Sequence, residues 1–144
     1  MDGLSVVASV TAVVQISSQI FDLCRTYYMS VKDARTDIQR LRDEVTSLQD
    51  VLASVVDLVD VPGSSTLSTL NLFTQPDGPA QQCHDELLKL LSILDQGQGK
   101  DKMKKFGLRA LKWPLSSKDV DKVLQDLERH KATFNLALAA DNTY

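Results

Sequence analysis

The sequence predicts an all-α domain: an antiparallel four- to five-helix bundle with a mostly apolar N-terminal helix. Three observations predict it. Apolar residues in the long segments recur at alternating spacings of three and four, which is the period of one buried helix face. No segment shows the strict alternation of a half-buried strand. Stretches rich in Pro, Gly and Ser separate the helical segments, and helices joined by modest loops pack as antiparallel neighbours.

The bulk properties are those of an ordinary single-domain protein. The 144 residues are enough for one core without disulfides or metals, and 43% hydrophobic with 24% charged residues is typical of a folded domain. Cys24 and Cys83 lie far apart without C-x-x-C spacing, so we expect two buried free thiols in a reducing compartment. We expect residues 1–141 to form the domain and residues 142–144 a short tail.

The opening segment, MDGLSVVASVTAVVQISSQIF, carries no charge from Gly3 to Phe21. No positive charge precedes it, which argues against a secretory signal peptide. Its length suits a membrane span, but Ser, Thr and Gln interrupt it. Two apolar lines run along the predicted helix: Val6, Val10, Val13 and Ile20, and beside them Leu4, Val7, Ala8 and Val14. Two interpretations stay open, a buried central helix and a helix that changes environment.

A second helix is predicted from about residue 33 to residue 60. Its apolar positions form a heptad stripe: Ile38, Leu41, Val45, Leu48, Leu52, Val55 and Val59. Charged residues occupy the other faces. The run from Ser30 to Asp33 has the form of a capping box that begins this helix.

The rest of the chain predicts two more helices. Residues 62–78 contain Pro-Gly and Asp-Gly-Pro and predict a long surface loop with one short turn near residues 67–73. Residues 79–94 predict a third helix with a buried face of Cys83, Leu87, Leu90, Leu91 and Leu94. Residues 117–139 predict the last helix, whose core face is Val120, Val123, Leu124, Leu127, Phe134 and Leu138. Ser116 and Asp119 form a second capping box at its start.

Positive charge is concentrated in one short segment, residues 100–112. Its basic residues are Lys100, Lys102, Lys104, Lys105, Arg109 and Lys112, against Asp101 alone. Bulky apolar residues, among them Phe106 and Trp113, are interleaved with them. Such a segment suits a membrane interface, where each cation contributes about 1 kcal/mol beside an anionic leaflet. The alternative is a solvated connector that packs on the bundle. We expect no nucleic-acid partner, because the chain is otherwise acidic and has no stacking platform.

The sequence contains no arrangement typical of an active site. His84 and His130 have no ligand-spaced partner, and the Gly-Gln-Gly run at residues 97–99 lacks a preceding strand. We therefore expect no enzyme activity, no cofactor and no metal site.

Three stretches resemble the fungal HeLo-like domain. They are MDGLSVVASVTAVVQISSQIFDLC, VKDARTDIQRLRDEVTSLQDVL and MKKFGLRALKWPLSSKDVDKVLQDLERHKATFNLAL, which stand in the same order from Met1 to about Asp141. This domain begins fungal STAND proteins, the NOD-like receptors with NACHT or NB-ARC cores, and is similar to the four-helix bundle of the mixed-lineage kinase domain-like pseudokinase. The resemblance implies a cell-death module of innate immunity and heterokaryon incompatibility. Such a module rests in the cytoplasm, oligomerises, moves to the plasma membrane and inserts its N-terminal helix.

The resemblance also implies which residues act. The membrane-insertion helix is Leu4, Val6, Val7, Val10, Val13, Val14, Ile16, Ile20 and Phe21. Some relatives have a glycine zipper in this helix; here the small residues that support close helix contact are Gly3, Ser5, Ala8, Ser9 and Ala12. The basic residues of 100–112 would bind lipid head groups, with Phe106 and Trp113 at the interface. The implied partners are further copies of this chain, anionic lipids and a receptor core in the same or another chain.

Two functions follow as hypotheses. The leading one is a membrane-targeting, cell-death-inducing domain that hides its first helix until clustering releases it. The alternative is a homotypic or adaptor interaction domain that assembles without touching lipid, through the charges that flank the heptad stripe.

Overall fold

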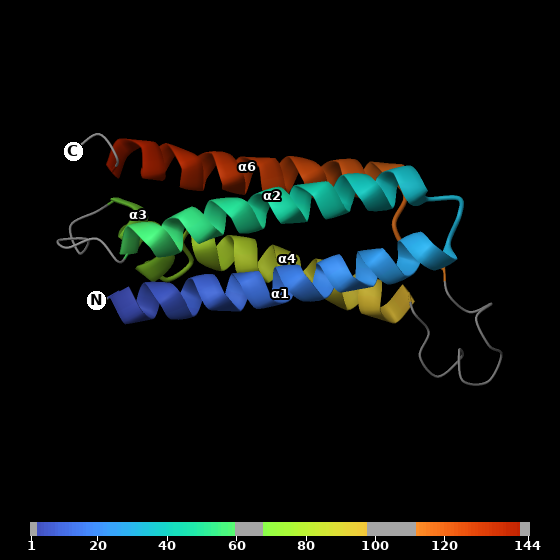
Figure 1. Cartoon of the computed structure of the whole chain (residues 1–144), viewed down its shortest axis with the longest axis horizontal. Coiled ribbons are helices and arrows are strands. Elements are labelled where there is room, and N and C mark those ends of the chain that lie inside the picture. Colours follow the sequence, from blue (N-terminus) through green and yellow to red (C-terminus); the bar gives the residue numbers. More distant parts are fainter. Residues whose placement is uncertain (1–2, 60–67, 98–111, 142–144) are drawn as a thin grey trace.

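The computed structural model describes residues 3–59, 68–97 and 112–141, and these ranges are all-α (Figure 1). The helices are α1 (Gly3–Ser30), α2 (Arg35–Val59), α3 (Ser68–Thr74), α4 (Pro79–Gly97) and α6 (Ser117–Asp141). The predicted class, a helical bundle with an apolar N-terminal helix, is confirmed.

The four long helices lie side by side; α1 and α4 run in one direction, and α2 and α6 run in the opposite one (Figure 1). α1 lies at one side of the bundle and α6 at the other, with α2 and α4 between them. The short α3 lies at the end where α1 begins and α6 ends, and it contacts both of these helices and α4. α1 therefore packs on α2, α3 and α4 and leaves its remaining face uncovered within the described ranges.

The core is aliphatic and follows the heptad stripe of α2. The fully buried stripe positions are Ile38, Leu41, Val45, Leu48, Leu52 and Val55. The predicted faces of α4 and α6 point into the same core, with Cys83, Leu87, Leu90, Leu94, Val120, Leu127, Phe134 and Leu138 buried. Leu91, Val123 and Leu124 are half-buried at its edge. Both cysteines are free and buried, as expected.

α1 is longer than its uncharged stretch suggests. The apolar spacing continues through Ile20, Cys24 and Tyr27, which are fully buried, while Asp22 and Arg25 lie on the exposed face. The predicted capping box at Ser30 is therefore wrong, because Ser30 is the last residue of α1. A four-residue connection follows, and α2 begins at Arg35.

The turn after α3 and the start of α6 are both determined by interactions between residues close in sequence. The predicted turn near residues 67–73 is the helix α3, and the tight turn after it places Asp77 at φ 56°. A Cβ at Gly78 would lie 3.0 Å from Gln75 Cβ, so a larger residue does not fit there without a shift. The capping box at the start of α6 is confirmed. Ser116 N donates to Asp119 Oδ2 (3.0 Å), and Asp119 N donates to Ser116 Oγ (3.1 Å).

Candidate membrane-insertion helix and its contacts

The inner face of α1 is a continuous apolar line. The buried residues are Val6, Val10, Val13, Ile16, Ile20, Cys24 and Tyr27. They recur at spacings of three and four, so they fall on one stripe that packs against α2, α3 and α4. The second predicted line is only partly covered, since Val7 and Val14 are half-buried and Ala8 is exposed. α1 is thus a one-sided core helix rather than a central helix surrounded by partners.

The outer face of α1 is exposed yet carries no charge before Asp22. Its exposed residues are Ala8, Thr11, Gln15, Ser18 and Gln19. α1 over Val6–Ser30 is long and apolar enough to cross a membrane by length and composition, and 33% of the apolar window is buried. A core helix of a soluble protein and a signal sequence pass the same test. The contacts of α1 with the rest of the bundle are therefore more informative than its composition.

Two hydroxyl groups of α1, those of Ser17 and Thr26, are bonded to their own helix. Ser17 is fully buried, and its Oγ donates to Val13 O at 2.8 Å. Thr26 Oγ1 donates to Asp22 O at 3.1 Å in the same way. Such a bond moves with the helix, so neither hydroxyl needs a new partner if α1 leaves the bundle. Two serines do bond outside α1, since Ser9 Oγ donates to Phe73 O (3.1 Å) and Ser18 Oγ accepts from Gln49 Nε2 (3.1 Å).

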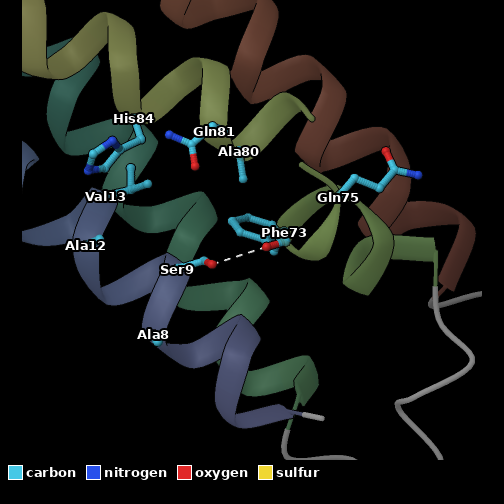
Figure 2. A pocket seen from close by; sticks show the side chains of 9 residues that line it. All are labelled: Ala8, Ser9, Ala12, Val13, Phe73, Gln75, Ala80, Gln81 and His84. Atoms are coloured by element: carbon cyan, nitrogen blue, oxygen red, sulfur yellow. Dashed lines mark hydrogen bonds between the residues drawn. The ribbon is translucent and has the colours of Figure 1, made fainter. Parts of the chain in front are cut away.

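A pocket lies beside the small residues of α1 (Figure 2). It has a volume of about 280 Å³, and its lining includes Ala8, Ser9 and Ala12 of α1 with Ala80 and His84 of α4. Ser9 points toward Phe73 of α3, whereas Ala8 and Ala12 contribute only a methyl group each to the wall of the pocket (Figure 2). The N-terminal half of α1 is thus held by Val6, Val10 and Val13 and one hydrogen bond to α3, with loose packing against α4.

The C-terminal half of α1 is held more firmly, by aromatic side chains. Tyr27 Oη donates to Leu94 O of α4 at 2.5 Å, and the Tyr27 ring meets the Trp113 ring edge to face at 5.1 Å. Burial raises the pKa of Tyr27 to about 12, and Asp95 and Cys24 add to the shift. On the α2 side, the guanidinium of Arg42 lies 4.9 Å from the centre of the Phe21 ring. The two halves of α1 therefore differ in how they are attached.

The other helices are joined by charged and polar contacts that involve α6. Arg40 of α2 pairs with Asp121 (2.7 Å), and Glu44 of α2 pairs with Lys131 (2.8 Å). On α4, Glu86 contacts His130 and Arg129. On α3, the Thr69 amide and hydroxyl both donate to Asp141 Oδ2, at 2.8 and 2.6 Å. No ion pair joins α1 to another helix within the described ranges.

A family model described as "Pigment biosynthesis cluster protein PigL N-terminal" (PigL_N) matches residues 1–143. The chain belongs to the PigL_N family. No curated protein and no solved structure matches it. In this PigL_N domain the geometry above therefore carries the functional argument, because the family description names a biosynthesis cluster and an N-terminal position but no reaction.

The predicted lipid-binding residues are only partly within the described ranges of this PigL_N domain. The residues outside them are Lys100, Lys102, Lys104, Lys105, Arg109 and Phe106. The side chains of Leu4 and Ser5 and the surroundings of Gly3 are likewise not described. Lys112 is exposed. Trp113 is 8% exposed and packs on Tyr27, so in this conformation it is a core residue, and its interfacial role stays a prediction that requires rearrangement.

Two sets of contacts in this PigL_N domain were not predicted from the sequence. Arg35 and Arg42 contact the aromatic rings of α1, although on the sequence they look like ordinary solvated charges of α2. His130 of α6 is buried against Glu86 of α4, a residue that stands 44 positions earlier in the chain. The position of Arg42 next to Leu41 of the heptad stripe was the available signal for the first set, because a long arginine side chain beside an apolar stripe can lie along its neighbours. No local signal marks the second.

Proposed function

We propose that this domain is a membrane-targeting, cell-death-inducing module of the HeLo-like kind, which releases α1 when several copies are clustered. One observation carries the proposal: α1 is uncharged over residues 3–21 and joined to the bundle by no ion pair within the described ranges, whereas α6 is joined to α2, α3 and α4 by charged contacts. The polar contacts that hold α1 are hydrogen bonds rather than ion pairs, so its release separates no pair of opposite charges within the described ranges.

The length of the uncharged stretch fits a bilayer. Residues 3–21 span roughly 28 Å as an α-helix, close to the hydrocarbon thickness of about 30 Å. The intrahelical bonds of Ser17 and Thr26 persist in either environment. Thr11 and Gln15 on the outer face would face neighbouring copies or a water-filled path, because polar side chains in hydrocarbon are expensive.

Burial of the inner face explains why α1 stays in place at rest. Full burial of a Val or Ile side chain contributes about 1.5–3 kcal/mol. Five such residues (Val6, Val10, Val13, Ile16 and Ile20) therefore contribute roughly 8–15 kcal/mol as an upper estimate. That is as large as the whole stability of a typical domain, about 5–15 kcal/mol. Release into water is too costly, so the acceptor must itself be apolar: lipid, or the helices of other copies.

Clustering supplies the second requirement. A receptor core in the same or another chain would hold several domains together and raise their effective concentration, which favours an assembled state over the closed bundle. In this proposal the domain rests in the cytoplasm and acts at the plasma membrane, with the basic residues of 100–112 drawing it to anionic lipids. Neither lipid binding nor assembly needs a cofactor.

The test is leakage of dye-filled anionic vesicles by the clustered protein. Gln15 is exposed at the middle of the uncharged stretch, so Gln15→Lys leaves the core intact. A Lys at the centre of a membrane helix costs about 2.5–3.5 kcal/mol, which lowers the inserted population roughly 70- to 400-fold. The matched control, Gln125→Lys, makes the same change at an exposed position of α6. We expect Gln15→Lys to abolish leakage and Gln125→Lys to preserve it; equal leakage by both variants would refute insertion of α1.

One observation favours the alternative, an assembly domain without membrane activity. Leu136 of α6 is 75% exposed, on a stretch that carries no charge from residue 132 to residue 140. The predicted surface for this function was the charges beside the stripe of α2, but Asp37 and Arg40 are already engaged by α6. If the alternative holds, Leu136→Ser blocks self-association measured by analytical ultracentrifugation, and wild-type protein binds no vesicle.

A further inference from the structure

The seam between the C-terminal half of α1 and the N-terminal half of α2 combines arginines with aromatic rings. The Arg42 guanidinium lies 4.9 Å from the centre of the Phe21 ring and 5.8 Å from that of Tyr28. The Arg35 guanidinium lies 5.1 Å from the centre of the Tyr28 ring, and its Nε donates to Tyr28 O at 3.2 Å. Two arginines of α2 thus hold two aromatic residues of α1, and we call these four residues the arginine clamp.

Among the described residues, the clamp arginines have no carboxylate partner. Arg35 and Arg42 form no ion pair with any described residue, although Arg40, on the same helix, has two. Arg42 Nε is buried and lacks a hydrogen-bond partner within the described ranges. The nearby carboxylate Asp43 accepts from Gln39 instead (2.7 Å). A third cation, Arg25, forms no ion pair with the described residues and lies on the same side of α1, because its spacing of four from Phe21 and three from Tyr28 places it between them.

Guanidinium groups without a carboxylate are suited to phosphate. The planar fork of Arg matches phosphate oxygens with two parallel, charge-assisted hydrogen bonds, which are stronger than a cation–π contact at an exposed site. A phosphate group that binds Arg35 and Arg42 draws them from the rings of Phe21 and Tyr28. The same event that binds the ligand therefore weakens the attachment of α1.

We propose that the arginine clamp binds the phosphate head groups of an anionic membrane, and that this binding loosens α1 from α2. The proposal rests on the proposed function and adds the trigger for it. A membrane is favoured as the source of phosphate because Phe21 and Tyr28, once uncovered, are apolar rings at the mouth of the site that bury into the interface. The seam also lies at the end of the bundle where α1 ends and α6 begins (Figure 1). Lys112 is exposed and directly precedes Trp113, which packs on Tyr27 of the same end of α1.

The clamp makes the release of α1 depend on the charge of the membrane surface. A ligand shifts a conformational equilibrium only by its differential affinity for the two states. In the closed state the arginines are shared with the rings, and in the open state they are free for phosphate. An anionic surface therefore favours the open state, whereas neutral lipid leaves the clamp closed.

The experiment measures amide hydrogen exchange of residues 17–30 and the emission of Trp113, the single tryptophan, which packs on Tyr27. The probes are phosphatidylcholine vesicles, phosphatidylcholine vesicles containing phosphatidylglycerol, and inositol hexakisphosphate in solution. For wild-type protein we expect faster exchange and a red-shifted emission with the anionic vesicles alone. The double variant Arg35→Gln/Arg42→Gln should exchange roughly tenfold faster than wild type without any vesicle, and should show no further response to the anionic ones.

The matched control is Arg40→Gln, which removes an arginine of the same helix that pairs with Asp37 and Asp121 and touches no ring of α1. It should respond to anionic vesicles as wild type does. A double variant that responds like wild type overturns the clamp, as does a wild-type response to inositol hexakisphosphate equal to that with vesicles. Vesicle leakage, recorded in parallel, tests the proposed function separately. Loosening of α1 without leakage supports the clamp and refutes permeabilisation. Leakage without loosening supports permeabilisation and refutes the clamp.

Discussion

The contact between Tyr27 and α4 gives the sharpest test of how α1 is held. Leu94 is one of the last four residues of α4, whose carbonyls have no partner in their own helix. The Tyr27 hydroxyl donates to that carbonyl at 2.5 Å in a fully buried position. Tyr27→Phe keeps the ring and its contact with Trp113 and removes only this donor. A buried carbonyl left unpaired costs about 1–3 kcal/mol, and we expect the free energy of unfolding to fall by that amount.

The assay is equilibrium unfolding in urea, followed by circular dichroism and by Trp113 fluorescence. The control is Tyr28→Phe, which keeps the ring that Arg35 and Arg42 contact; it should change the free energy of unfolding by less than about 0.5 kcal/mol. A stability of Tyr27→Phe equal to wild type, with the same dependence on urea, would contradict this account of the end of α4. In vesicle leakage the variant should be more active than wild type, because α1 is less firmly attached.

Two further predictions concern contacts made by the other helices. Thr69→Val removes one of the two donors to the buried Asp141 carboxylate and should lower the free energy of unfolding by about 1.5–3 kcal/mol, measured in urea; an unchanged midpoint would mean that α3 is not held by this contact. The hydrogen bonds from Ser116 lower the pKa of Asp119, so its contribution to stability is complete above the unfolded pKa and is lost as the pH falls through the folded value. Wild type should therefore be more stable than Asp119→Asn at neutral pH and converge with it below about pH 4; a constant difference down to lower pH would contradict the capping box.

Periodicity predicted the parts of the fold that local spacing determines. The stripe of α2 from Ile38 to Val55 is buried as expected because a spacing of three and four allows only one face to meet the core. The capping box of Ser116 and Asp119 was also predictable from the local sequence, because all of its atoms lie within four consecutive residues. The capping box at Ser30 was wrong because α1 continues past Asp22 and Arg25, which lie on its exposed face, and includes Ser30 as its last residue.

Contacts between distant segments could not be predicted. Trp113 follows a basic segment and was assigned to a membrane interface, yet it lies against Tyr27, 86 residues earlier in the chain, because the segment that precedes α6 packs on the end of α1. The clamp depends in the same way on the rotation of α2 about its axis relative to α1, which decides whether Arg42 faces solvent or Phe21. The polar contacts of α6 with three other helices are equally invisible to a local pattern.

The movement of α1 away from α6 is the central claim, and a distance between the two helices tests it most directly. Spin labels at Gln15→Cys and Gln125→Cys occupy exposed positions of α1 and α6. The native thiols do not compete for the label, because burial raises the pKa of Cys24 and of Cys83 to about 12 and keeps them protonated. Pulsed dipolar spectroscopy of the clustered protein, diluted with unlabelled copies, should give one distance in solution and a second, clearly different one on anionic vesicles. A distance unchanged on vesicles that leak would contradict the release of α1.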